Sequence, residues 1–233
     1  MKRIKLFMVM LLSLVGMTAA AQQPTLISST AKPVTSSTLT TGKYLIAAGT
    51  TDGSYYFNVN EGKVQAPSTK QVFTYTKDNY LQRKSDNKYV YYGIESGYGL
   101  TTITSSQPMT ISFNGGDAAS IKPNTRLNQR YIVSNGNDAD AAGVNKKQSY
   151  DWYFYKAAVV TITYRDVTNS KDINTVTYVG RVGDKLECPA IKGYTLSSTE
   201  TSSYSVEKDA TVTVNYTNDK GEITEGDLPN GRY

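Results

Sequence analysis

The sequence predicts an all-β protein made of two consecutive β domains. Short runs rich in Tyr, Val and Ile, such as KYLIAA, SYYFNV and KYVYYG, alternate with stretches such as TTDGS and KSDNK. Aromatic and β-branched residues favour strands, whereas Gly, Asn, Asp and Ser favour turns. No sustained apolar period of 3.6 residues, which would indicate a helix, runs through the first half of the chain.

Residues 1–21 have the features of a bacterial Sec signal peptide. Three basic residues precede the apolar residues 6–17, a stretch too short to span a bilayer. Three consecutive alanines at 19–21 form a small-residue cleavage signal, so Gln22 is the expected mature N-terminus. We therefore expect Sec-dependent export without a transmembrane segment, and a periplasmic, cell-surface or extracellular location.

Charge and composition exclude several function classes. Removing the three basic residues of the signal leaves 22 Lys and Arg against 20 Asp and Glu, and the basic residues are scattered. This pattern lacks the basic stripe that tracks phosphates, so we expect no nucleic-acid partner. The chain has no histidine, which excludes His-based triads and the commonest metal ligand. We expect no metal, no cofactor and no enzymatic activity; a hydrolase would need a carboxylate pair that sequence spacing does not identify.

Residues 22–41 are rich in Ser and Thr and contain two prolines. This composition predicts a linker, with room for a short edge strand near Leu26 and Ile27. The single cysteine, Cys188, excludes an internal disulfide and is expected to be a buried, unreactive thiol. At the other end, residues 219–233 are polar and are predicted to form a flexible tail.

An internal repeat divides residues 42–156 into three units, each with four apolar stations. Corresponding stations are 34–36 residues apart between the first two units and 40–44 apart between the last two. The fourth station holds Phe73, Met109 and Trp152 in turn. Three units of four short strands resemble a β-trefoil, the architecture of ricin-type lectin domains. The resemblance implies that these three side chains face one shared core.

The Gln-x-Trp signature of ricin-type lectins is absent from the repeat. Only its glutamine remains, as Gln71 and Gln107. No sugar-contacting residue is therefore carried over from that family. By strand alternation, Phe154 should point the same way as Trp152, and Tyr153 and Tyr155 the other way.

Residues 157–218 have a different pattern. VVTITYRD, at 159–166, alternates as a half-buried strand, and a turn-rich middle leads to a closing strand. The module resembles the mucin-binding-protein (MucBP) repeat, a small β-grasp-like domain of bacterial surface proteins. The matching residues are Val160, Ile162, Tyr164, Asp166, Gly180, Val182, Gly183, Asp184, Pro189, Gly193, Tyr194, Leu196, Val212, Val214 and Tyr216. The resemblance implies either a rigid spacer or a direct contact with a glycan or glycoprotein.

A tyrosine-rich stretch, YVYYGIESGYG at 89–99, is the candidate ligand site. Tyr92 and Tyr98 flank a Gly-rich loop that also carries Glu95. Aromatic rings beside a carboxylate are suited to stack on a sugar and accept its hydroxyl hydrogen bonds. The alternative is that these tyrosines only fill half-buried strand faces.

The sequence thus predicts an exported, non-enzymatic binding protein that weakly recognises glycan or mucin-like glycoprotein ligands. The alternative is a secreted structural or protein-interaction subunit without sugar binding, including a trefoil that acts as a protease inhibitor.

Overall fold

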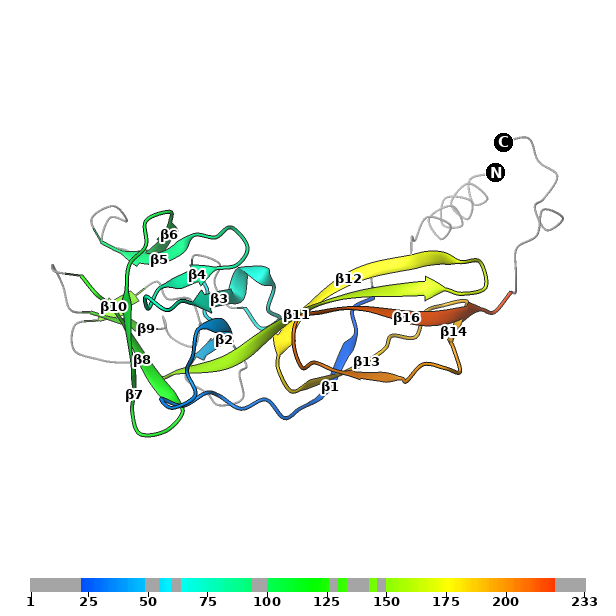
Figure 1. Ribbon diagram of the computed structural model, residues 1–233, viewed down its shortest axis with the longest axis horizontal. Helices are drawn as coiled ribbons and strands as arrows, with labels where there is room; N and C mark the ends of the chain where they lie inside the picture. The colour runs from blue at the N-terminus through cyan, green and yellow to red at the C-terminus, as the bar shows by residue number, and fades with distance from the viewer. Residues whose placement is uncertain are drawn as a thin grey trace, which may run out of the picture.

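Strand β11 (Trp152–Asp166) is 15 residues long and runs through both halves of the molecule (Figure 1). The computed structural model describes residues 22–48, 55–59, 64–93, 100–125, 130–133, 143–145 and 150–220. The first part of β11 pairs with β2 (Gly42–Ala48), and from Ala157 onward it pairs with β12 (Lys171–Arg181). The predicted domain boundary, between residues 156 and 157, therefore lies inside one continuous strand.

The N-terminal unit comprises β2 to β10 with the first part of β11. Its remaining elements are β3 (Val72–Tyr75), β4 (Leu81–Arg83), β5 (Tyr89–Tyr92), β6 (Leu100–Ile103), β7 (Met109–Phe113), β8 (Ala118–Pro123), β9 (Tyr131–Val133), β10 (Gly143–Asn145) and a 3₁₀ turn, η1 (Thr69–Gln71). Hydrogen bonds connect six of these strands in the order β4-β3-β2-β11-β8-β7. The ends of this path approach each other, because Met109 N at the start of β7 donates to Asn79 O, 2.7 Å away, just before β4.

Three further pairings lie beside this path. β5 pairs with β6 and is joined to β4 by the single pair of Gln82 and Tyr89, while β9 pairs with β10. After β2, Tyr56 N donates to Val64 O at 2.9 Å. Each pairing falls between the second and third stations of one predicted repeat.

The core of the N-terminal unit contains the three fourth-station residues. Phe73, Met109 and Trp152 are at most 1% exposed, which confirms their predicted burial. Trp152 Nε1 donates to Ile132 O at 3.0 Å, and its ring meets Phe57 edge-on with centroids 5.2 Å apart. The only tryptophan is therefore a core residue rather than an exposed stacking platform.

The C-terminal unit comprises the rest of β11 and the remaining strands. These are β1 (Thr25–Ser29), β12, β13 (Asp184–Glu187), β14 (Tyr194–Leu196), β15 (Ser203–Ser205) and β16 (Ala210–Asn218). One sheet has the order β12-β11-β16-β14, in which β11 and β16 are parallel, and the other has the order β1-β13-β15. On β11, Val160, Ile162 and Tyr164 are all buried in the core of this unit, which confirms the predicted alternation.

The segment predicted as a linker is tied to both units. Its residues 25–29 form β1, antiparallel to β13, in agreement with the suggested edge strand. Further along, Val34 enters the core of the N-terminal unit, and its N–H donates to Phe154 O at 2.8 Å. From residue 22 on, the chain thus passes first through the C-terminal unit, then forms the N-terminal unit and returns along β11 (Figure 1).

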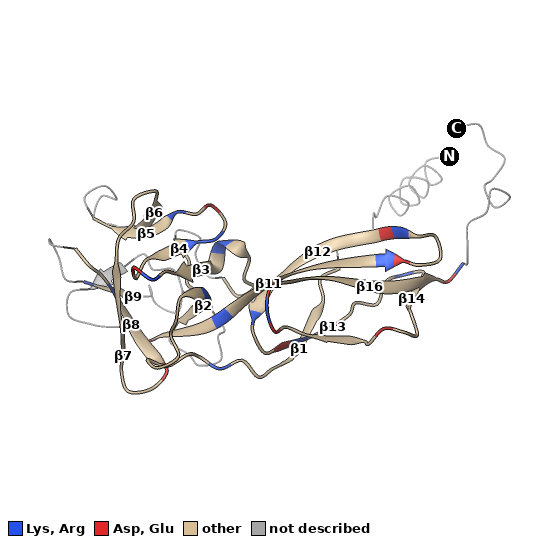
Figure 2. Cartoon of the chain, in the orientation of Figure 1, with Lys and Arg blue, Asp and Glu red and all other residues tan. Residues whose placement is uncertain are grey.

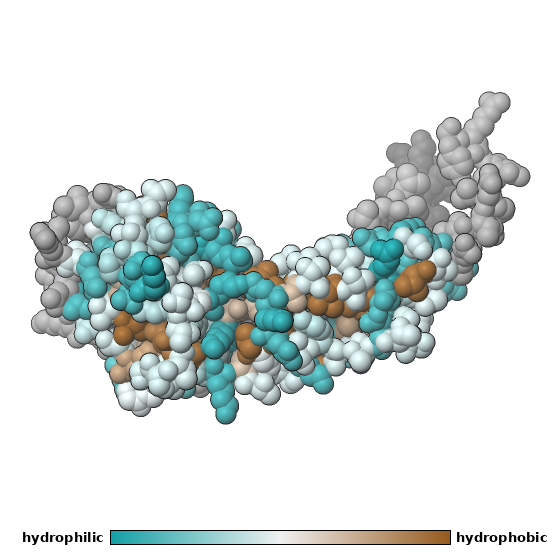
Figure 3. Space-filling model, viewed as in Figure 1, coloured by the Kyte–Doolittle hydropathy of each residue, from teal (hydrophilic) through white to brown (hydrophobic). Residues whose placement is uncertain are grey.

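A small apolar cluster holds the two units together. Leu45, Tyr56 and Val72 of the N-terminal unit pack with Ala157 and Val179 of the C-terminal unit. Figure 3 shows hydrophobic atoms reaching the surface where the units meet. Within the described residues, no helix is both long and apolar enough to cross a membrane.

Candidate functional site

A cleft of about 670 Å³ lies where the two units meet. Its walls are Gln23, Pro24 and Leu26 at the start of β1, the loop 65–69, and residues 177–180 of β12, together with Tyr56 and Asp184. This volume lies within the usual range for ligand pockets, and domain junctions are a common place for them. The cleft is therefore the candidate ligand site.

The loop wall is held in place by a capping box around η1. Ser68 N and Ser68 Oγ both donate to Oε1 of Gln71, at 3.0 and 2.8 Å. Gln71 is 1% exposed, so the glutamine of the repeat serves as a buried anchor. These bonds place Ser68 and Thr69 on the cleft wall.

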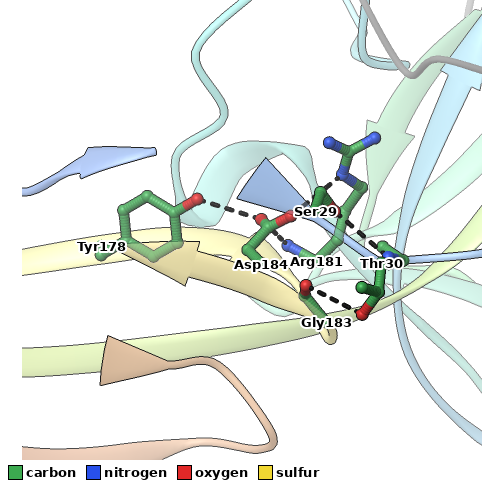
Figure 4. Close-up of polar contacts among 7 residues, drawn as sticks. Ser29, Thr30, Tyr178, Arg181, Gly183 and Asp184 are labelled. Atoms are coloured by element: carbon green, nitrogen blue, oxygen red, sulfur yellow. Dashed lines mark hydrogen bonds and ion pairs between the residues drawn. The ribbon is translucent and has the colours of Figure 1, made fainter. Parts of the chain in front are cut away.

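Asp184 connects β1, β12 and β13 by hydrogen bonds beside the cleft (Figure 4). Oδ1 accepts a hydrogen bond from Ser29 Oγ at 2.6 Å, while Oδ2 accepts from Tyr178 OH at 3.0 Å and from Arg181 N at 2.7 Å. The carboxylate is 2% exposed, and both of its oxygens have partners. Buried charges need such compensation, so Asp184 is a structural anchor for β1, β12 and β13.

Two glycines permit this close packing. Gly183 has φ +103°, and a Cβ there would lie 2.8 Å from Ala31 N. At Gly180, a Cβ would lie 2.3 Å from Cε1 of Tyr178 and 2.6 Å from Oδ2 of Asp184. Any larger residue at 180 would therefore displace the tyrosine ring from its carboxylate partner.

The described lining of the cleft contains no Lys or Arg, and Asp184 is its one carboxylate. The uncharged polar groups are the amides of Gln23 and Gln65, the hydroxyls of Ser and Thr, and the phenols of Tyr56 and Tyr178. Burial and then the charge of Asp184 raise the pKa of Tyr178, whose hydroxyl donates to that carboxylate. In Figure 2, charged residues are spread over both units.

The described part of the chain contains no cluster of three or more His, Cys, Asp or Glu suited to a metal. Glycoside hydrolysis in its usual form needs two carboxylates on either side of the scissile bond. The cleft offers Asp184 alone, and its oxygens are already engaged. Apart from Asp184, the described walls present uncharged polar groups and apolar side chains.

A second, more charged groove of about 450 Å³ also lies at the junction. Lys43 forms an ion pair there with Asp209, whose Oδ1 also accepts from Val159 N at 2.9 Å. Although burial by itself would raise the pKa of Asp209, its bonds to Lys43 and Val159 lower it below the ordinary value. Asp209 thus links β2 to the start of β16, a structural contact between the units.

The structure tests part of the site predicted from the sequence. Tyr92 lies at the end of β5, is 2% exposed and belongs to the core of the N-terminal unit. Its N–H donates to Gln107 Oε1 at 2.8 Å, and Gln107 Nε2 donates back to Tyr92 O at 2.9 Å. A ring buried in this way presents no face to a sugar. Glu95 and Tyr98 lie outside the described residues, so their role stays a prediction.

Strand alternation is the signal that identifies the position of Tyr92. Val90 and Tyr92 share one face of β5, and Val90 is fully buried. The cleft residues carry no comparable signal, because Gln23, Gln65 and Tyr178 are far apart in the sequence and are brought together only by the fold.

No protein-family model matches the chain, and no curated protein matches it in sequence.

Proposed function

We propose that this is an exported, non-enzymatic binding protein that recognises glycan or mucin-like glycoprotein ligands in the cleft between its two units. The observation that carries the proposal is the lining, in which amides and hydroxyls lie beside apolar and aromatic side chains and the one carboxylate, Asp184, is already hydrogen-bonded. Neutral sugars present hydroxyl groups and apolar ring faces, and such a wall complements both.

For the N-terminal unit we propose a β-trefoil-like architecture. Two observations support it: the path of six strands whose ends are linked by Met109 and Asn79, and the three pairings beside it. A third is that Gln71 and Gln107, from equivalent places in the repeat, are both buried and hydrogen-bonded.

For the C-terminal unit we propose a β-grasp-like module of the MucBP type. Its first long strand, β11, lies parallel to its last strand, β16, and antiparallel to β12. Cleavage after residue 21 would leave every cleft residue in the exported chain, since the lining begins at Gln23. Export therefore agrees with a cleft that is complete in the mature protein.

The test is a glycan-array and mucin-binding screen with residues 22–233. A single shallow site should bind with a Kd on the order of 0.1–1 mM. Gln65→Ala, at an exposed position on the cleft wall, should weaken binding at least about fivefold without changing the melting temperature. Thr211→Ala, exposed on β16 outside the lining, is the matched control and should bind like the wild type.

A wild type that binds no glycan or mucin at millimolar concentration would remove the sugar-binding function. The second candidate, a secreted protein-interaction subunit, would then take its place. One observation favours that candidate: among the described strands, β12 pairs only with β11, so its other edge is open.

A further inference from the structure

The open edge of β12 is an unusual feature of the cleft. β12 is 11 residues long, and β11 is its only partner among the described strands. An edge strand presents unpaired N–H and C=O groups at every second residue, which makes it a template for another extended chain. Lys171, Asp172 and Arg181 place charges near its ends, whereas residues 173–180 carry none.

The register of the ladder identifies which backbone groups point outward. Val182 N donates to Lys156 O at 2.8 Å, so these two residues form a hydrogen-bonded pair. Bonded and non-bonded pairs alternate along an antiparallel ladder. Thr177 and Val179 face Thr161 and Val159 at the intervening, non-bonded positions. Their N–H and C=O groups therefore point away from β11.

Contacts of neighbouring residues agree with this assignment. Val159 N donates to Asp209 on the far side of β11 rather than to β12. On β12, the outward N–H of Thr175 is bound by Asn174 Oδ1 at 2.8 Å, and that of Arg181 by Asp184 Oδ2 at 2.7 Å. Side chains thus bind the outward amides of Thr175 and Arg181, which lie on either side of Thr177 and Val179.

Between these two positions, the described residues provide no partner for the amides of Thr177 and Val179. The same two residues line the cleft, next to the loop 65–69 and Tyr56. The free part of the strand edge and the candidate ligand site therefore coincide.

We propose that an extended, uncharged segment of polypeptide adds to β12 as a further strand along Thr177–Val179, with its side chains in the cleft. This rests on the proposed function, because it uses the same site, and it names the peptide part of a glycoprotein as what the cleft holds. In strand addition, main-chain hydrogen bonds supply affinity and the flanking pockets supply specificity.

The cleft offers no free charge to a ligand, which favours an uncharged peptide. A charged side chain would lose hydration there without gaining a partner, because the described lining lacks Lys and Arg and the oxygens of Asp184 are occupied. A segment rich in Ser, Thr and Pro, as in a mucin-like glycoprotein, meets this requirement.

Amide hydrogen exchange in the free protein tests whether the edge is open. Thr177 and Val179 should exchange at least about a hundredfold faster than Val176 and Tyr178, whose amides bond to β11. Equal protection of all four amides would show that the edge is covered and would overturn the inference.

Binding is tested with three probes: an immobilised mucin-type glycoprotein, the same glycoprotein after deglycosylation, and the released oligosaccharides. Thr177→Pro removes one outward N–H and no internal hydrogen bond, which an edge strand tolerates. Thr175→Pro is the matched control, because Thr175 is exposed on β12 outside the cleft lining and its N–H already bonds to Asn174. Thr177→Lys keeps the backbone and adds a charge at the edge, so it serves if the proline variant fails to fold.

The inference expects binding to the intact and the deglycosylated glycoprotein, at least tenfold weaker for Thr177→Pro and Thr177→Lys and unchanged for Thr175→Pro. The protein could instead bind the oligosaccharides but not the deglycosylated glycoprotein, with this binding unchanged in Thr177→Pro. That result would overturn the inference and keep the proposed function. Absence of binding to all three probes would remove both.

Discussion

Ser29 Oγ donates a 2.6 Å hydrogen bond to Oδ1 of Asp184, across 155 positions of the sequence. The bond joins the end of β1 to the start of β13, where Thr30 N also donates to Gly183 O at 2.9 Å. Through it, the segment that precedes the N-terminal unit is held in the C-terminal unit. The wall of the cleft that Gln23, Pro24 and Leu26 form therefore depends on the pairing of β1 with β13.

Replacement of Asp184 by Ala should lower the free energy of unfolding by about 2–4 kcal/mol, since buried donors lose their acceptor. Tyr178 OH and Arg181 N are the part-buried groups left without it. Ser29→Ala, which removes one hydrogen bond, should cost about 1 kcal/mol. Urea unfolding followed by circular dichroism measures both, and equal small losses would show that Asp184 is not an anchor.

Tyr164 and Tyr216 form a matched pair in the core of the C-terminal unit, with ring centroids 5.9 Å apart. Tyr216 OH donates to Pro189 O at 2.8 Å, whereas the buried hydroxyl of Tyr164 has no partner among the described residues. Burial, followed by the influence of Cys188, raises the pKa of Tyr164 to about 12.

Tyr164→Phe should therefore leave stability unchanged or raise it by about 1 kcal/mol, because it removes an unsatisfied polar group. Tyr216→Phe should lower stability by about 1 kcal/mol, because it removes a hydrogen bond. Both are measured by urea unfolding. The reverse order of the two variants would mean that the Tyr164 hydroxyl has a partner in solution.

The hydrogen bonds of Asp166 predict that the C-terminal unit loses stability at acidic pH. Burial by itself would raise the pKa of this carboxyl, but hydrogen bonds from Asn169, Asn218 and Thr168 outweigh it and lower the pKa below the ordinary value. The folded state thus binds its proton less readily than the unfolded state. The stabilisation is complete above the unfolded pKa, near 3.9, and is lost as the pH falls through the folded pKa.

Unfolding free energies measured from pH 6 down to pH 2.5 should therefore fall below about pH 4. Asp166→Asn should make that fall shallower, and Asp172→Asn, an exposed position, is the control. An NMR titration that places the Asp166 carboxyl at or above its ordinary pKa would contradict the prediction.

The fragment 157–218 should fold by itself, because its buried cluster is built from residues 158–216. It lacks β1 and with it the bond from Ser29 to Asp184, so it should be less stable than the same unit in the full chain. NMR amide dispersion reports folding, and a peptide of residues 22–32 should shift the amide signals of β13. An unfolded fragment would show that the boundary at 157 is wrong.

Local pattern predicted the parts of the fold that depend on neighbouring residues. The alternation of Val160, Ile162 and Tyr164 places them on one buried face because successive side chains of a strand point to opposite sides. The turn at Gly183 follows from the residue type, and its φ of +103° is a conformation that glycine adopts without a steric penalty.

The prediction from local pattern was wrong at Tyr92, where β5 ends and a loop begins. The sequence predicts Tyr92 beside a Gly-rich loop as a ligand contact, yet the residue completes the buried face of β5 with Val90. The sequence shows that Tyr91 and Tyr92 point in opposite directions, and the alternation with Val90 is the one local signal for which of the two faces the core. A hydroxyl-bearing ring suits either side, so residue type does not decide the question.

By itself, the sequence determined that the chain is mostly β, that Phe73, Met109 and Trp152 are buried, and where single strands alternate. These properties depend on residue type and on a period of two residues, both of which are local. Only the tertiary structure decided that β11 crosses both units, that β1 pairs with β13, and that β12 keeps an open edge beside the cleft. Strand partners are chosen by the packing of segments far apart in the chain, and no local pattern records that choice.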